Sequence, residues 1–302
     1  MKNENLGADE IYLAPETTPE EKAEPVAASS EENEISHAPE LEPEDPAKSV
    51  RVSEIIELRE ENRKVFRMSD GSEQAVFFPE AVHVLNEETQ TFDDVDNTIT
   101  LEEDKRHYKS GKNHFKARFS CEEDNDELFS IESGMHRVTV STKKNTKQKN
   151  KGVKPEVRKK EAEGFERTDL LAFKDVHGGA DYEYSVNGNG VKENIVVKEK
   201  RDIYRFPFTL HCENVTARFE EENNRVAFIS NESGEEVFFI PAPFMTDAND
   251  IISTAVSYEF KTRANGDSVL TVTADSDWIN AENRAFPVVI DPQIKLSASS
   301  AM

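Results

Sequence analysis

Cysteine, tryptophan and long apolar runs are scarce in this sequence. Its 302 residues include two cysteines, Cys121 and Cys212, and one tryptophan, Trp278. A secreted fold that depends on disulfides needs more cysteines, so we expect two free, half-buried thiols, although a pair between them stays open. No apolar run approaches the roughly 20 residues of a membrane-spanning helix. Residues 1–30 lack a basic start followed by an apolar core, so we expect no membrane span and no signal peptide in this chain.

Known catalytic and ligand-binding motifs are also missing. Gly188-Asn189-Gly190 opens onto a strand, which favours a turn over a phosphate loop. There is no Gly-x-Ser-x-Gly pentapeptide, and Ser133 and His136 are close only in sequence. The seven histidines form no short pair that would bring two imidazoles to one metal: His37, His83, His107, His114, His136, His177 and His211. The sequence therefore predicts no catalytic, cofactor-binding or metal-binding residues and no cofactor.

Two loops are rich in oxygen ligands, at residues 124–127 and 247–250. Calcium takes six to eight oxygens, and neither loop has the fixed glycine and distal glutamate of an EF-hand. We interpret both as turn-forming segments, and calcium binding at the surface stays open.

Acidic residues are abundant: 61 Asp and Glu face 37 Lys and Arg, for a net charge of −24. Residues 1–48 alone hold 14 acidic and three basic side chains, six prolines and one aromatic residue, Tyr12. Such a segment cannot bury enough apolar surface to offset chain entropy. We predict a disordered acidic tail over residues 1–50, with an acidic docking tail as the alternative.

The charge reverses between Lys143 and Lys160, where nine Lys and Arg residues accompany a single acid, Glu156. Nucleic-acid patches usually interleave aromatic side chains with the cations, and this stretch has none. We predict a flexible basic linker over residues 143–164 and no nucleic-acid partner. Contact with acidic neighbours or with an anionic wall polymer is the alternative.

The rest of the chain alternates strand-like runs with tight turns. Asp70-Gly71 separates two such runs and indicates a hairpin, as does the turn 187–190 in the second half. Only residues 275–283, around Trp278, favour a short helix. The sequence predicts an all-β fold of two antiparallel β-sandwich-like modules, residues 51–142 and 165–296, with at most one or two short helices and a C-terminal tail, residues 297–302.

The run Phe286–Ile290 is followed by Asp291-Pro292 and few further residues. Proline cannot donate to a strand ladder, so we expect the last strand to end here, at a domain boundary.

Seven strings, taken together and in order, carry a resemblance to a known family: residues 57–67, 70–71, 78–83, 95–98, 189–195, 240–245 and 286–292. The set resembles the region that precedes the DNRLRE domain and the YD repeats in RHS-type wall-associated and polymorphic-toxin proteins of Gram-positive bacteria. The resemblance implies a β-rich segment of an exported polypeptide at the cell surface or outside the cell, and implies no catalytic residue.

The sequence thus predicts a non-catalytic structural or interaction scaffold module, and not an enzyme. Its expected partners are downstream domains of the same polypeptide, with a cell-wall polymer or glycan as a further candidate. One alternative is a carbohydrate- or wall-binding module that uses Trp278, Tyr182 or Tyr204 as stacking platforms. A second is a hydrolase with a carboxylate pair brought together by folding.

Overall fold

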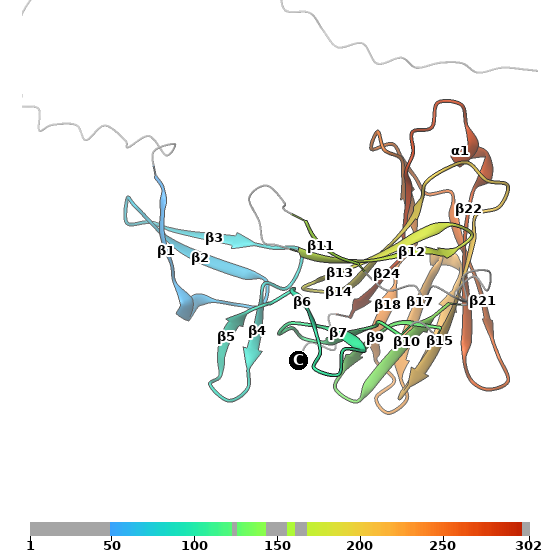
Figure 1. Ribbon diagram of the computed structural model, residues 1–302. Coiled ribbons are helices and arrows are strands. Elements are labelled where there is room, and N and C mark those ends of the chain that lie inside the picture. The colour runs from blue at the N-terminus through green and yellow to red at the C-terminus, as the bar shows by residue number, and fades with distance from the viewer. Residues whose placement is uncertain (1–48, 123–125, 143–155, 161–167, 298–302) are drawn as a thin grey trace, which may run out of the picture. The chain divides into compact units, whose positions relative to one another are not determined.

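The computed structural model describes residues 49–122, 126–142, 156–160 and 168–297 (Figure 1). This part forms four antiparallel sheets, one short α-helix, α1 (Ser276–Asn280), and two 3-10 helices, η2 (Ile56–Leu58) and η4 (Glu221–Asn223). The predicted all-β fold of antiparallel, sandwich-like sheets is confirmed. Among the described residues, no helix is long and apolar enough to cross a membrane.

An eight-stranded sheet contains strands from both halves of the chain. Its order is β21-β22-β15-β10-β9-β8-β7-β6. In chain order the strands are β6 (Ile99–Leu101), β7 (His107–Ser110), β8 (Lys116–Ser120), β9 (Glu127–Ser133), β10 (His136–Ser141), β15 (Arg205–Glu213), β21 (Val256–Thr262) and β22 (Ser268–Ala274). The junction between the halves is β10 against β15, with Val138 opposite Cys212.

An eleven-stranded sheet has the main order β11-β12-β13-β14-β24-β18-β17-β16, and β23, β19 and β20 branch from β14. Its strands are β11 (Glu156–Lys160), β12 (Thr168–His177), β13 (Ala180–Asn187), β14 (Gly190–Val197), β16 (Val215–Glu220), β17 (Arg225–Ser230), β18 (Glu236–Ile240), β19 (Phe244–Thr246), β20 (Ile252–Ser253), β23 (Val288–Asp291) and β24 (Gln293–Leu296).

The two large sheets pack against each other through one hydrophobic core. Apolar residues alternate along their strands and therefore line one face of each sheet. Aromatic rings join the two layers: Tyr184 of β13 lies 5.1 Å from Phe129 of β9 and 5.9 Å from Phe119 of β8, between ring centroids. Tyr182 of β13 meets Phe208 of β15 at 5.5 Å. The sandwich is thus assembled from residues far apart in the sequence.

Two smaller sheets precede the sandwich in the sequence. One is β1-β2-β3, formed by β1 (Arg51–Glu54), β2 (Arg63–Met68) and β3 (Glu73–Phe77); the other pairs β4 (His83–Asn86) with β5 (Thr91–Asp94). The predicted hairpin at Asp70-Gly71 joins β2 to β3, and Gly71 has a left-handed φ of 84°. Asp70 Oδ1 accepts a hydrogen bond from the Ser72 amide at 2.9 Å, which closes the turn.

The predicted modules, residues 51–142 and 165–296, share the eight-stranded sheet. Within the predicted linker 143–164, residues 156–160 form β11, which pairs with β12. The other linker residues, as well as residues 1–48 and 298–302 of the predicted tails, lie outside the described part. The division into two separate modules stays a prediction.

The chain does not end its β structure at Asp291-Pro292. β23 runs into β24 across this dipeptide, and both pair with β14: Ile195 lies opposite Ile290, and Val191 lies opposite Ile294. Pro292 falls between the two paired segments, where its carbonyl accepts from the Glu193 amide at 3.2 Å. Its missing N–H therefore interrupts the ladder without ending it, and β24 goes on to pair with β18.

Candidate functional site

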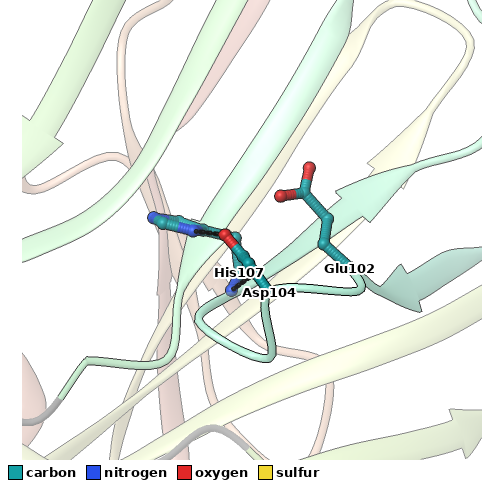
Figure 2. A group of neighbouring side chains, drawn as sticks. All are labelled: Glu102, Asp104 and His107. Carbon is teal, nitrogen blue, oxygen red and sulfur yellow. Dashed lines mark hydrogen bonds and ion pairs between the residues drawn. The ribbon is translucent and has the colours of Figure 1, made fainter.

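One cluster of titratable side chains lies on the hairpin that joins β6 to β7. Glu102 directly follows β6, Asp104 lies in the turn, and His107 begins β7 (Figure 2). Asp104 Oδ1 accepts hydrogen bonds from the amides of Arg106 at 2.8 Å and His107 at 3.3 Å. This Asx-type turn holds the carboxylate beside the imidazole.

The three side chains offer ligand or proton-transfer atoms within 4.8 Å of one another. His107 Nδ1 lies 3.1 Å from Asp104 Oδ2. Hydrogen bonds from the Arg106 amide and the His107 ring lower the pKa of Asp104. The carboxylate is therefore ionised near neutral pH, orients the ring and favours a proton on Nδ1, which leaves Nε2 as the proton-accepting nitrogen.

Arg118 of β8 already neutralises these carboxylates. Its Nη2 donates to Glu102 Oε2 at 2.5 Å and to Asp104 Oδ2 at 3.2 Å, and its Nε donates to both Glu102 oxygens. The Glu102 hydrogen bond raises the pKa of Arg118. A divalent cation would have to displace this guanidinium. The donor set therefore suits an imidazole–carboxylate–guanidinium site better than a metal centre.

Three cations lie near this cluster, and one of them, Arg106, pairs with Glu122 at 3.5 Å. Lys105, Arg106 and Lys109 lie on the same hairpin and are exposed. The arrangement combines a proton acceptor, an orienting carboxylate and cations that can face an anion. These are the groups that general acid–base attack on a phosphodiester needs.

The sequence prediction of no site residues did not single out this cluster, because acids and histidines are common in the chain. The spacing Glu102-x-Asp104-x-x-His107 was the available local signal. Arg118 could not be assigned from the sequence, since it reaches Glu102 only through the pairing of Lys109 with Arg118 across β7 and β8.

The loop at residues 247–250 uses its first carboxylate to hold the loop itself. Asp247 Oδ1 accepts from the amides of Asn249 and Ile251 at 2.9 and 3.0 Å, and Oδ2 accepts from Arg284 at 2.9 Å. These partners occupy both carboxylate oxygens, which supports the turn interpretation. Of the other loop, residues 124 and 125 lie outside the described part.

Ser133 and His136 lie opposite each other across β9 and β10, but no hydrogen bond joins their side chains. His136 Nε2 instead lies 3.0 Å from Ser230 Oγ, and that oxygen also lies within hydrogen-bond distance of the amides of Glu232 and Ser233. Ser230 is buried, so this contact closes the turn after β17 and presents no nucleophile to solvent.

The proposed stacking platforms are not open. Tyr182 and Tyr204 are 0% and 1% exposed. The Arg284 guanidinium covers Trp278, 3.5 Å from its ring centroid. None of the three therefore presents a free ring face to a sugar.

Both cysteines are half-buried, and no disulfide joins Cys121 to Cys212. Burial raises the pKa of the Cys212 thiol to about 11, so it is a poor nucleophile near neutral pH.

A second titratable group lies inside the sandwich. Glu193 of β14 is buried among apolar side chains and accepts a hydrogen bond from the Tyr184 hydroxyl at 2.7 Å. Burial raises the pKa of Glu193 to about 8. Burial also raises the pKa of nearby Asp291, whose Oδ2 pairs with Lys192 at 2.8 Å. Glu193 is therefore a largely neutral core acid at pH 7.

His83 of β4 lies in the interior of the protein. It is fully buried, and its Nδ1 lies 2.7 Å from the Glu60 carbonyl oxygen, so Nδ1 carries the proton. Its Nε2 makes no hydrogen bond and lies 3.4 Å from Glu54 Oε1 and 3.7 Å from Asp94 Oδ1. Arg59 bridges the same two carboxylates.

Fold and site together define an all-β sandwich protein with a half-buried imidazole–carboxylate cluster. No family model and no solved structure matches the sequence. The chain is 26% identical over 256 residues, 82% of its length, to the tRNA nuclease WapA of Bacillus subtilis strain 168. The same values hold for the tRNA(Glu)-specific nuclease WapA of B. subtilis subsp. natto and the tRNA3(Ser)-specific nuclease WapA of Bacillus spizizenii. The chain spans only 10–11% of the length of these relatives.

These relatives correct several predictions. The resemblance to the region before a DNRLRE domain and YD repeats was wrong, because the relatives found are named as WapA nucleases and neither DNRLRE nor YD repeats were found. The predictions of a non-catalytic scaffold, with carbohydrate binding as the alternative, of no enzyme and of no nucleic-acid partner were also wrong, since the relatives are named as enzymes that act on tRNA. This chain carries none of the familiar hydrolase and nucleotide-binding motifs, so no local signal in the sequence indicated an enzyme.

Proposed function

We propose that this chain takes part in a nuclease that acts on tRNA. The similarity over 82% of the chain to three proteins named as tRNA nucleases carries the proposal. Two of these names specify different tRNAs at the same identity, so the tRNA species is left open.

Within this proposal, the cluster of Glu102, Asp104, His107 and Arg118 is the candidate cleavage site. His107 Nε2 takes the proton of a ribose 2′-hydroxyl, and the 2′-oxygen attacks the adjacent phosphorus. The bond from phosphorus to the 5′-oxygen breaks, and that oxygen receives the proton from His107. Asp104 orients the ring, and Arg118 neutralises Glu102 and Asp104 so that they do not repel the phosphate. Lys105 and Lys109 contact the flanking phosphates.

The test is cleavage of total tRNA by the purified chain, followed on denaturing gels. We expect cleavage that falls by at least roughly 100-fold in His107→Ala. His211→Ala is the matched control, because His211 also pairs with an aspartate, at 2.8 Å from Asp267, yet is exposed elsewhere. Equal loss in both variants, or intact tRNA, would remove His107 from the proposal.

Failure of the site and failure of the function can be distinguished. A longer polypeptide that contains this chain and resembles the relatives over their length is assayed with and without His107→Ala. tRNA cleavage that survives the substitution keeps the nuclease proposal and places the chemistry outside this cluster. If the longer polypeptide also leaves tRNA intact, the proposed function is wrong.

We further propose a cell-surface or extracellular location, in keeping with the wall association of the WapA relatives. Protease treatment of intact cells checks it: surface-exposed chain is degraded while a cytoplasmic marker survives. Protection of the chain equal to that of the marker would contradict this location.

A further inference from the structure

A polar cleft lies where the turn between β13 and β14 meets the segment before β4. Its volume is about 310 Å³. Its polar lining consists of Glu61, Asn62, Glu80, His114, Asn189 and Ser297. It lies apart from the cluster around His107, and the inference drawn from it does not depend on the proposed nuclease function.

The wall between Pro79 and Ala81 is held in place by the 187–190 turn. Asn189 Oδ1 accepts from the Ala81 amide at 3.1 Å, and Asn189 Nδ2 donates to the Pro79 carbonyl at 3.3 Å. Gly188 approaches the same backbone so closely that a Cβ there would lie 1.9 Å from the Ala81 carbonyl oxygen. These contacts preform the cleft, so little ordering is needed when a ligand enters.

The cleft carries uncompensated negative charge. Glu61 and Glu80 line it, and no lysine or arginine does. Glu61 has one ionic neighbour among the described residues, His114, whose Nε2 lies 3.8 Å from Glu61 Oε1. That Nε2 lies 2.8 Å from the His83 carbonyl and donates its proton there. Glu80 Oε1 accepts from the neutral Asn187 amide at 3.0 Å. A concave site with this charge attracts cations.

The spacing of the groups favours an organic cation over a metal ion. Within the described part, the one group of three His, Cys, Asp or Glu residues whose ligand atoms converge within 4.8 Å is the hairpin cluster at Glu102. The ligand atoms of Glu61, Glu80 and His114 therefore do not converge on one position that could hold a metal ion. Pro79, Ala81 and Leu296 add apolar lining between them, which suits an alkyl stem.

We propose that this cleft binds an alkylammonium group, with Glu61 and Glu80 as the charge partners and the apolar lining around the carbon chain. Lysine side chains and diamines have this chemistry. A phosphate-bearing ligand would be repelled by Glu61 and Glu80, so the cleft serves a different ligand from the cluster around His107.

The experiment is isothermal titration of the full chain with cadaverine, with 1-pentanol and glutarate as the neutral and anionic probes of similar length. We expect saturable 1:1 binding of cadaverine alone. Glu61→Gln and Glu80→Gln each weaken it by about tenfold, the effect of one charge-assisted hydrogen bond. Both variants keep the shape of the side chain, and their thermal transitions confirm that they remain folded.

Glu88→Gln is the matched control, because it changes the net charge by the same amount at an exposed loop residue outside the cleft. If Glu88→Gln weakens binding as much as Glu61→Gln, the cation merely follows the overall charge of −24 and the site is refuted. Absence of saturable binding up to about 10 mM cadaverine, ten times a Kd of about 1 mM, overturns the proposal, as does tighter binding of glutarate.

Discussion

The sandwich and the three-stranded sheet β1–β3 differ in what their strands bury. Along β13, Tyr182, Tyr184 and Val186 are each 0% exposed. In β1–β3, Val65 is the one buried residue, and Phe77 is 67% exposed. Since burial of apolar surface is the main stabilising term in folding, the stability of this chain is concentrated between the two large sheets. The sheet β1–β3 buries little apolar surface and therefore contributes little to this stability.

The largest expected effect comes from emptying the core. Phe129→Ala removes a ring that is 2% exposed and contacts Phe119 and Tyr184, so we expect a loss of about 3–5 kcal/mol in the free energy of unfolding. Phe77→Ala, the matched change in the small sheet, changes it by about 0.5 kcal/mol or less. Urea denaturation measures both. Similar losses in the two variants would remove the contrast between the sheets.

The same variant tests whether residues 51–142 and 165–296 unfold together. Phe129 lies in the first stretch, and Trp278, the single tryptophan, lies in the second. Because β10 pairs with β15, we expect the fluorescence transition of Trp278 to shift to lower urea in Phe129→Ala. A transition that stays in place would show independent folding of the two stretches.

A pH series distinguishes the buried acid from the surface acids. The pKa of Glu193 is about 8 in the folded chain, against an ordinary value of 4.5. Between these values the folded state keeps a proton that the unfolded state releases, so the free energy of unfolding falls as pH rises. The slope is at most about 1.4 kcal/mol per pH unit, and the loss is complete above pH 8.

Glu193→Gln removes this loss while keeping an acceptor for Tyr184. We expect the variant to be more stable than the parent chain at pH 8, by roughly a few kcal/mol, and equal to it below pH 4.5, in thermal denaturation. Asp104 behaves oppositely: its lowered pKa gives stability that is lost as pH falls. A constant difference between Glu193→Gln and the parent chain at every pH would contradict the raised pKa.

The smallest effect concerns the contact between the sandwich and the small sheets. Gly188→Ala places a Cβ against the Ala81 carbonyl, and we expect a loss of about 1–3 kcal/mol, with faster hydrogen exchange at the Ala81 amide. Gly234→Ala is the control for backbone strain without a clash. Gly234 has a φ of 76° and open space around it, so we expect the substitution to cost about 1 kcal/mol and to leave exchange at Ala81 unchanged. Unchanged exchange in Gly188→Ala would show that this contact does not hold the segment.

Much of the fold was predictable, and the candidate site was not. Asp70-Gly71 and the turn 187–190 indicated their hairpins, and Asp275 indicated the start of α1, where its carboxylate accepts from the Trp278 amide at 2.7 Å. The burial of Glu193 could have been predicted from the sequence. Glu193 alternates in step with Val191, Ile195 and Val197, which places it on the core face of β14. No short stretch of sequence indicated the hydrogen bond between Arg118 and Glu102, because it depends on the pairing of β7 with β8.

The sequence by itself determined the strands and the hairpin turns, because strand alternation and turn residues act over a few neighbouring positions. Only the tertiary structure decided that β10 pairs with β15, that β24 continues past Pro292 to reach β18, and that Glu193 is buried beside Asp291. It also formed the cleft around Glu61 and Glu80. Each of these depends on which distant strands share a sheet, and that choice is made by burial of the whole core, which no short stretch of sequence encodes.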